Sequence, residues 1–75
     1  RSKIKDLIRD VDGVEGVKDV KTRWIGRKIW VDLEVKIPGR VLLEEGLLMT
    51  QRLKNVIFQN MEQIGDITVR LSPVE

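Results

Sequence analysis

The stretch from Lys28 to Ile37 constrains the fold of this chain more than any other. Aliphatic and polar side chains alternate through it without interruption, except that Trp30 stands among the polar ones. Such alternation, rich in β-branched residues, is typical of a strand buried on one face. The aliphatic face holds Ile29, Val31, Leu33, Val35 and Ile37, and the other face holds Lys28, Trp30, Asp32, Glu34 and Lys36. We expect the first face to pack against helices and the second to meet solvent or a partner.

The composition limits both the stability and the chemistry of the chain. Its 75 residues form one small domain, residues 1–75, near the lower size limit for a self-sufficient core, so a partner subunit is an expected source of stability. The absence of cysteine and histidine excludes disulfides, Ser-His-Asp and Cys-His catalytic pairs, and the usual zinc and copper sites. We therefore expect no enzyme. The net charge of +2, with acids and bases interleaved, also gives no reason to expect a nucleic-acid partner.

The rest of the chain predicts two helices and two further strands. Helical spacing of apolar residues indicates helices over about residues 3–11 and 41–63, with Gly65 ending the second. Strands are expected over residues 17–25 and 66–72, and Gly26-Arg27 fits a type II′ turn between the first strand and the next. In the first of these strands we expect Trp24 to point inward. The long helix carries more apolar residues than packing on one sheet face requires, namely Leu43, Leu47, Leu48, Phe58 and Met61.

The element order αββαβ predicts an α+β, ferredoxin-like fold. A three-stranded sheet whose inner faces share one side is covered most economically by both helices on that side. The other face of the sheet is then open. It would carry Lys21, Arg23, Ile25, Trp30, Asp32, Glu34, Thr68 and Arg70.

With these elements in place, the sequence resembles the cytoplasmic C-terminal domain of cation diffusion facilitator transporters. Residues 12–26 look like the opening of that domain, and Val31-Asp32-Leu33-Glu34 is similar to its Val-Asp-x-His-like motif. Residues 42–45 and 66–73 fit the remaining landmarks, so the resemblance covers nearly the whole chain. Trp30-x-Asp32 is also similar to magnetosome-associated members of the family, which handle iron.

The resemblance implies a regulatory domain of a divalent metal cation efflux transporter. By this resemblance the chain would be part of a longer membrane protein and would lie on the cytoplasmic side of the membrane, beside its own transmembrane domain. Two copies of it would form a homodimer. Metal bound between the two copies draws them together. The family's ligands are histidines and a carboxylate, and those positions hold Glu34, Gly46, Arg70 and Ser72 here. Zinc-driven closing by the usual route is therefore not expected.

The open face offers two interpretations for each of its notable residues. Trp30 either lies along its own sheet or anchors a partner subunit. Asp32 and Glu34 either pair with cations on neighbouring strands, such as Arg23, Lys21 or Arg70, or supply oxygen ligands to a hard cation such as Mn²⁺, Fe²⁺ or Mg²⁺. By the resemblance, a cation at the dimer interface would be iron, manganese or zinc. The predicted dimer interface comprises Trp30, Asp32, Glu34 and Arg70, with Asp32 and Glu34 as the candidate metal ligands.

The sequence also permits a function of another class. Ferredoxin-like folds host many functions, so the chain could be a free-standing small-molecule-sensing or RNA-binding module. RNA-binding sheets present several stacked aromatic side chains, whereas Trp30 is the one aromatic residue expected on this open face.

Overall fold

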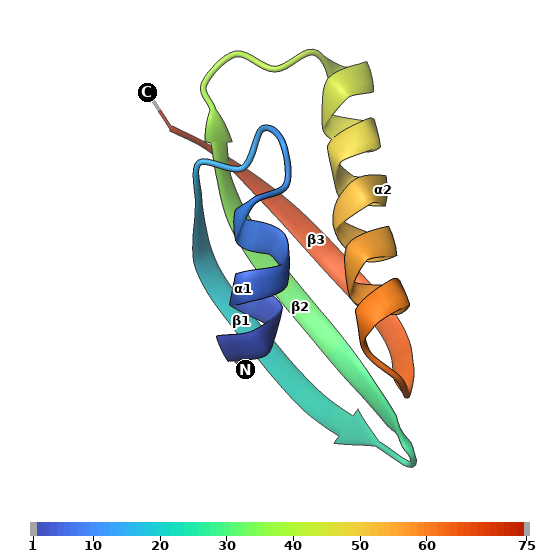
Figure 1. Ribbon diagram of the computed structural model, residues 1–75. Coiled ribbons are helices and arrows are strands. Elements are labelled where there is room, and N and C mark those ends of the chain that lie inside the picture. Colours follow the sequence, from blue (N-terminus) through green and yellow to red (C-terminus); the bar gives the residue numbers. More distant parts are fainter. Residues whose placement is uncertain (1, 75) are drawn as a thin grey trace.

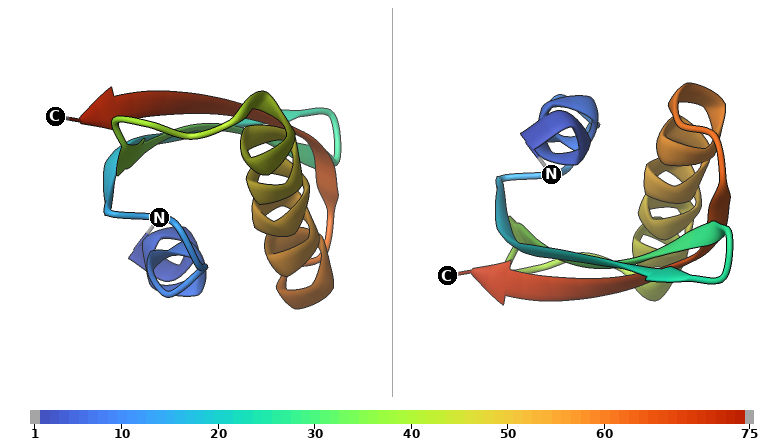
Figure 2. Two further views of the ribbon diagram at one scale, coloured as in Figure 1. Left: turned by 90° about the horizontal axis from the view of Figure 1, so that it is seen from above. Right: turned by 90° about the horizontal axis from the view of Figure 1, so that it is seen from below.

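Residues 2–74, which the computed structural model describes, form two helices and three strands (Figure 1). In chain order these are α1 (Ser2–Arg9), β1 (Gly16–Ile25), β2 (Lys28–Pro38), α2 (Leu43–Asn60) and β3 (Ile64–Val74). The sheet order is β1-β2-β3, with β1 antiparallel and β3 parallel to the central β2. Both helices cover the same face of the sheet (Figure 2). The predicted αββαβ, α+β arrangement with one open sheet face is confirmed.

The core lies between the two helices and the strands β2 and β3. The alternation in β2 places its aliphatic side chains beneath the helices, where four of them are buried. No polar or charged side chain is buried among the described residues, so the core is held together by apolar packing. The buried residues are Ile4, Ile8, Val31, Leu33, Val35, Ile37, Met49, Leu53, Ile57, Ile64 and Ile67.

The long helix is shorter than predicted at both ends. Leu42 precedes it with an extended backbone (φ −65°, ψ 151°), and Met61 follows it with another (φ −135°, ψ 138°). Ile64, which continues the helical spacing, is the first residue of β3 and is buried there. Gln63 makes the turn in the left-handed region at φ 68°, so the prediction that Gly65 ends the helix is wrong. Pairing of β3 with β2 buries Ile64 in the sheet and outweighs a weak preference to extend the helix.

The connection between α1 and β1 also differs from the prediction. α1 ends at Arg9, two residues before the predicted end. Gly13 then turns the chain with φ 93°, and a Cβ atom at this position would collide with the side chain of Met49. This close approach seats the loop against α2, and only glycine satisfies both the backbone angle and the space.

The β1–β2 hairpin has the predicted turn, but its Trp24 side chain is less buried than expected. Gly26 has φ 62° and Arg27 is not in the positive-φ region, as a type II′ turn requires. Trp24 pairs with Ile29 and so lies on the helix side of the sheet, yet it is 61% exposed. The eight residues of α1 cover the opposite end of β1 and leave the hairpin end bare (Figure 1).

Candidate interaction surface on the sheet

The open face of the sheet gathers the four predicted interface residues. On β2, Trp30, Asp32 and Glu34 alternate with the buried aliphatic residues. On β3, Arg70 lies opposite Glu34 in the parallel register. Sequence reasoning therefore placed these four side chains on the correct face, and the register sets which of them meet.

Glu34 is held between two cationic side chains. Its Oε1 lies 3.8 Å from Nη1 of Arg70, and its Oε2 lies 3.6 Å from Nζ of Lys18. For Glu34 the structure thus shows the first of the two predicted interpretations, pairing with cations on neighbouring strands, and Arg70 is one of the partners expected. Lys18 was missed, because it enters through a β-bulge between Val17 and Asp19 that alternation does not reveal. The Glu34 side chain is 22% exposed, and a metal ion would compete with both cations for its oxygens.

Asp32 differs from Glu34 in its surroundings. It lies opposite Lys21 on β1 and Thr68 on β3, and none of the ion pairs among residues 2–74 involves it. Next to it is a hollow of about 70 Å³, lined by Asp19, Lys21, Asp32, Leu33, Glu34, Thr68 and Arg70. Within residues 2–74, no three His, Cys, Asp or Glu side chains converge as a metal site requires.

Trp30 packs along its own sheet and is 38% exposed. A Cβ atom added at Gly65 would lie 2.8 Å from the indole Nε1 and 2.9 Å from Cβ of Lys28. Gly65 is the additional residue at an irregularity where Ile29 and Trp30 face Ile64 and Asp66. The ring thus crosses the neighbouring strand at the one position without a side chain, and its exposed part remains open to a partner.

A second surface lies between the first turns of α2 and the edge strand β3. Its rim is a leucine ridge, formed by Leu42, Leu43 and Leu47, which are 67%, 79% and 63% exposed. The ridge borders a groove of about 290 Å³, lined by Ile37, Val41, Leu42, Leu43, Gly46, Leu47, Thr50, Val69 and Leu71. The sequence predicted Leu43 and Leu47 as surplus apolar residues, whereas it predicted neither the exposure of Leu42 nor the position of all three beside β3.

Gly46 and Glu45 have structural roles at this end of α2. A Cβ atom on Gly46 would lie 3.3 Å from Cδ1 of Leu71, so the glycine allows α2 to approach β3 closely. Oε1 of Glu45 accepts a hydrogen bond of 3.1 Å from the backbone N–H of Leu42. A carboxylate in the first turn satisfies a free backbone donor and suits the positive end of the helix.

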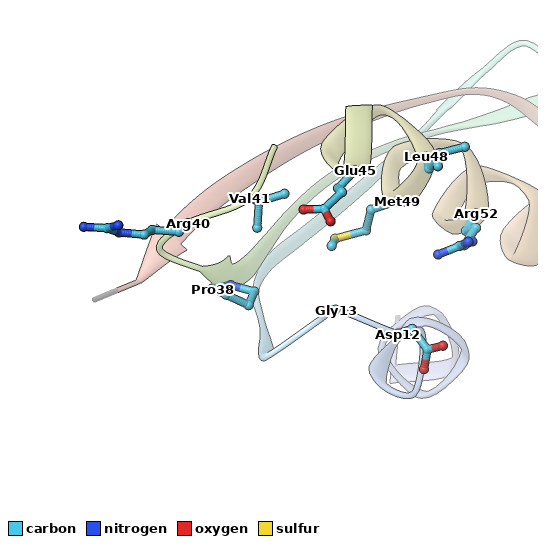
Figure 3. A pocket seen from close by; sticks show the side chains of 9 residues that line it. All are labelled: Asp12, Gly13, Pro38, Arg40, Val41, Glu45, Leu48, Met49 and Arg52. Atoms are coloured by element: carbon cyan, nitrogen blue, oxygen red, sulfur yellow. The ribbon is translucent and has the colours of Figure 1, made fainter. Parts of the chain in front are cut away.

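A hollow lies between the loop after α1, the loop after β2 and the first half of α2 (Figure 3). It measures about 430 Å³ and is lined by Asp12, Gly13, Pro38, Arg40, Val41, Glu45, Leu48, Met49 and Arg52. Its charged side chains are of both signs, and Figure 3 shows Arg40 extending away from the centre. This arrangement lacks the convergent polar groups of a ligand site.

Comparison with known proteins identifies the fold and the family. In the solved structures, the copper form of the MamM CTD has a TM-score of 0.92 at 20% identity, covering 99% of this chain and 72% of that one. A doubly substituted MamM CTD also has a TM-score of 0.92 at 20% identity, covering 99% of this chain and 88% of that one. A variant with one histidine replaced by alanine has a TM-score of 0.90 at 20% identity, covering 99% and 92%. Similarity at this level of identity shows the fold alone.

Sequence comparison is more specific. No curated protein matches this chain. The family described as "Cation efflux protein, cytoplasmic domain" matches residues 1–74, and it is not an enzyme family. Neither α1 nor α2 is long and apolar enough to span a bilayer, among the residues described. Since the match extends over nearly the entire chain, this chain belongs to the cytoplasmic domains of cation efflux proteins.

Proposed function

We propose that the chain is the homodimerising regulatory domain of a divalent-cation efflux transporter, acting at the cytoplasmic side of the membrane. The observation that carries the proposal is the leucine ridge. Three adjoining leucines are exposed beside an open strand edge, in a domain with a small core. Contiguous exposed apolar surface of this kind is typical of protein contacts. The alternative of a free-standing small-molecule or RNA-binding module loses its support, because the family is a transporter domain.

The edge of β3 links the two candidate surfaces. Val69 and Leu71 line the groove beside the leucine ridge. Arg70, between them in sequence, lies on the open face and pairs with Glu34. A second copy placed against this edge would cover the ridge with apolar contacts and would reach the charged residues at its rim. The predicted interface of Trp30, Asp32, Glu34 and Arg70 then forms the polar side of a contact whose apolar side is the ridge.

The donor set of this chain does not suit zinc. The sequence contains neither histidine nor cysteine, and Glu34 is already paired with Lys18 and Arg70. We therefore propose that the dimer forms without zinc. Asp32 is our candidate ligand for a harder cation, such as Mn²⁺ or Fe²⁺, together with Asp32 of a second copy.

Sedimentation equilibrium of the 75-residue chain over a range of micromolar concentrations tests the dimer. Leu47→Asp should weaken association at least about tenfold, because a carboxylate would be buried against apolar surface. Leu48→Asp is the matched control, since it places the same charge one residue further along α2, where Leu48 lines the hollow beside Met49 and Arg52. A wild-type chain that stays monomeric at every concentration, or equal association of the two variants, would contradict the proposal.

A further inference from the structure

The closed end of the β1–β2 hairpin has a composition that the fold does not require. Figure 1 shows the turn projecting past the helices, at the end of the molecule where α1 begins and α2 ends. Residues 22–31 include Arg23, Arg27 and Lys28 but no aspartate or glutamate. Beside these cations, Trp24 and Ile25 are 61% and 46% exposed. We call Arg23, Trp24, Ile25, Arg27 and Lys28 the hairpin tip.

The rest of the domain leaves the hairpin tip unpartnered. None of the ion pairs among residues 2–74 involves its three cations. The neighbouring Asp66 lies opposite Trp30, and its Oδ1 accepts a hydrogen bond from the N–H of Ile67. Trp24 lies on the helix side of the sheet and is nevertheless largely exposed. The tip is therefore both cationic and apolar, and it faces outward.

We propose that the hairpin tip binds the anionic lipid surface of the membrane that carries the transporter. An indole ring favours the headgroup region, where its apolar body and its N–H are both accommodated. Arginine and lysine side chains bind lipid phosphates, and the cytoplasmic leaflet carries a negative surface potential. The hairpin tip supplies both features within one short turn.

The position of the first helix also supports an orientation in which the hairpin tip faces the membrane. The family to which the chain belongs is a cytoplasmic domain of a membrane protein, and its solved relatives are C-terminal domains. A C-terminal domain is reached from the membrane through its first element. α1 begins at the same end of the molecule from which the hairpin tip projects (Figure 1). The orientation follows from the family and from the position of the hairpin, and it does not depend on the proposed dimer.

Vesicle binding tests the proposal. The probes are vesicles of phosphatidylcholine with about one-third phosphatidylserine, and vesicles of phosphatidylcholine alone. The Trp30→Phe variant leaves Trp24 as the one tryptophan, so its emission reports on the tip. We expect the chain to sediment with the anionic vesicles only, the Trp24 emission to shift to shorter wavelength, and both effects to fall as salt is raised.

Two charge variants distinguish binding through the hairpin tip from the nonspecific attraction of a basic protein to anionic lipid. Arg27→Glu with Lys28→Glu should lower the partition coefficient at least roughly 30-fold, because each cation near an anionic surface contributes about 1 kcal/mol. The double variant Arg40→Glu with Arg52→Glu lowers the net charge by the same amount, but at positions outside the hairpin. It should still bind the anionic vesicles. Trp24→Ala keeps the charge and should also weaken binding.

Three results would overturn the proposal. They are absence of binding to the anionic vesicles, equal loss of binding in the two charge variants, and a Trp24 emission shift that follows protein concentration without lipid. The last would assign the tip to a contact between copies. Sedimentation without lipid reports on the dimer separately, so failure of one proposal is distinguishable from failure of the other.

Discussion

At the scale of single residues, the neighbours of a carboxylate decide what it can bind. Glu34 and Asp32 are both acidic residues on the same face of β2. Glu34 has Lys18 and Arg70 within 4 Å, whereas no ion pair of Asp32 occurs among the described residues. The sequence predicts two equivalent candidate ligands, and the structure shows that their electrostatic surroundings differ.

Removal of both cations should therefore increase metal binding. In a Lys18→Ala, Arg70→Ala chain, Glu34 loses two competing positive charges, and Mn²⁺ affinity should rise at least about tenfold over wild type. Isothermal titration calorimetry measures the change. Adding Asp32→Ala to this background should abolish the gain. If the gain persists without Asp32, the two carboxylates do not act together.

Gly65 is the residue that fixes the position of Trp30. Gly65→Ala should lower the free energy of unfolding by about 1–3 kcal/mol, because the new Cβ collides with the indole and with Cβ of Lys28. Denaturant titration gives the loss, and Trp30 emission in a Trp24→Phe background reports the displaced ring. Gly16→Ala is the matched control in a strand, since its Cβ would meet only Cδ of Lys36 at 3.6 Å. A similar loss in both variants would show that strand glycines matter here for reasons other than this contact.

At the scale of elements, the sequence predicts the two faces of a strand from the alternation of apolar and polar residues more reliably than it predicts where a helix or strand ends. Strand β2 and its two faces follow directly from residues 28–37, because the period of two has no competing interpretation. The end of α2 was misplaced because Ile64 fits a helical stripe as well as a strand. The strand register was not predictable either, since it depends on irregularities near Val17 and Gly65 that leave no periodic signal.

The turn between α2 and β3 contains a non-glycine residue with a positive φ, which glycine would adopt at lower energy. Gln63 adopts φ 68°, a region that costs side-chain-bearing residues about 1 kcal/mol or more. Gln63→Gly should raise the free energy of unfolding by about 0.5–1 kcal/mol, as measured by denaturant titration. Gln59→Gly, within α2, should lower it by about 1 kcal/mol. A loss of stability at both positions would mean that backbone strain at Gln63 is negligible.

At the scale of the whole molecule, the chain lacks the usual means of sensing pH. Its sequence contains no histidine, and no ionisable side chain is buried among residues 2–74. Histidine is the side chain whose ordinary pKa lies between about 5 and 8.

The free energy of unfolding should accordingly change little between about pH 6 and pH 8, because folding takes up or releases few protons in that interval. Denaturant titrations at the two pH values, at constant ionic strength, give the difference. The dimer dissociation constant should be equally insensitive. A strong dependence in either quantity would indicate an ionisable group whose surroundings change on folding or on association.

The two edges of the sheet differ in a way that bears on aggregation. β1 carries Lys18, Lys21 and Arg23 along its edge together with a bulge, and such features discourage strands of other molecules from pairing. β3 presents eleven residues with Arg70 as its one cation, and Pro73 interrupts its donors only near the end. If a second copy normally covers this edge, a chain made monomeric by truncating a leucine would expose it to uncontrolled strand addition. A charged replacement such as Leu47→Asp places a carboxylate beside the bare edge, and should keep the separated chain soluble where Leu47→Ala would precipitate.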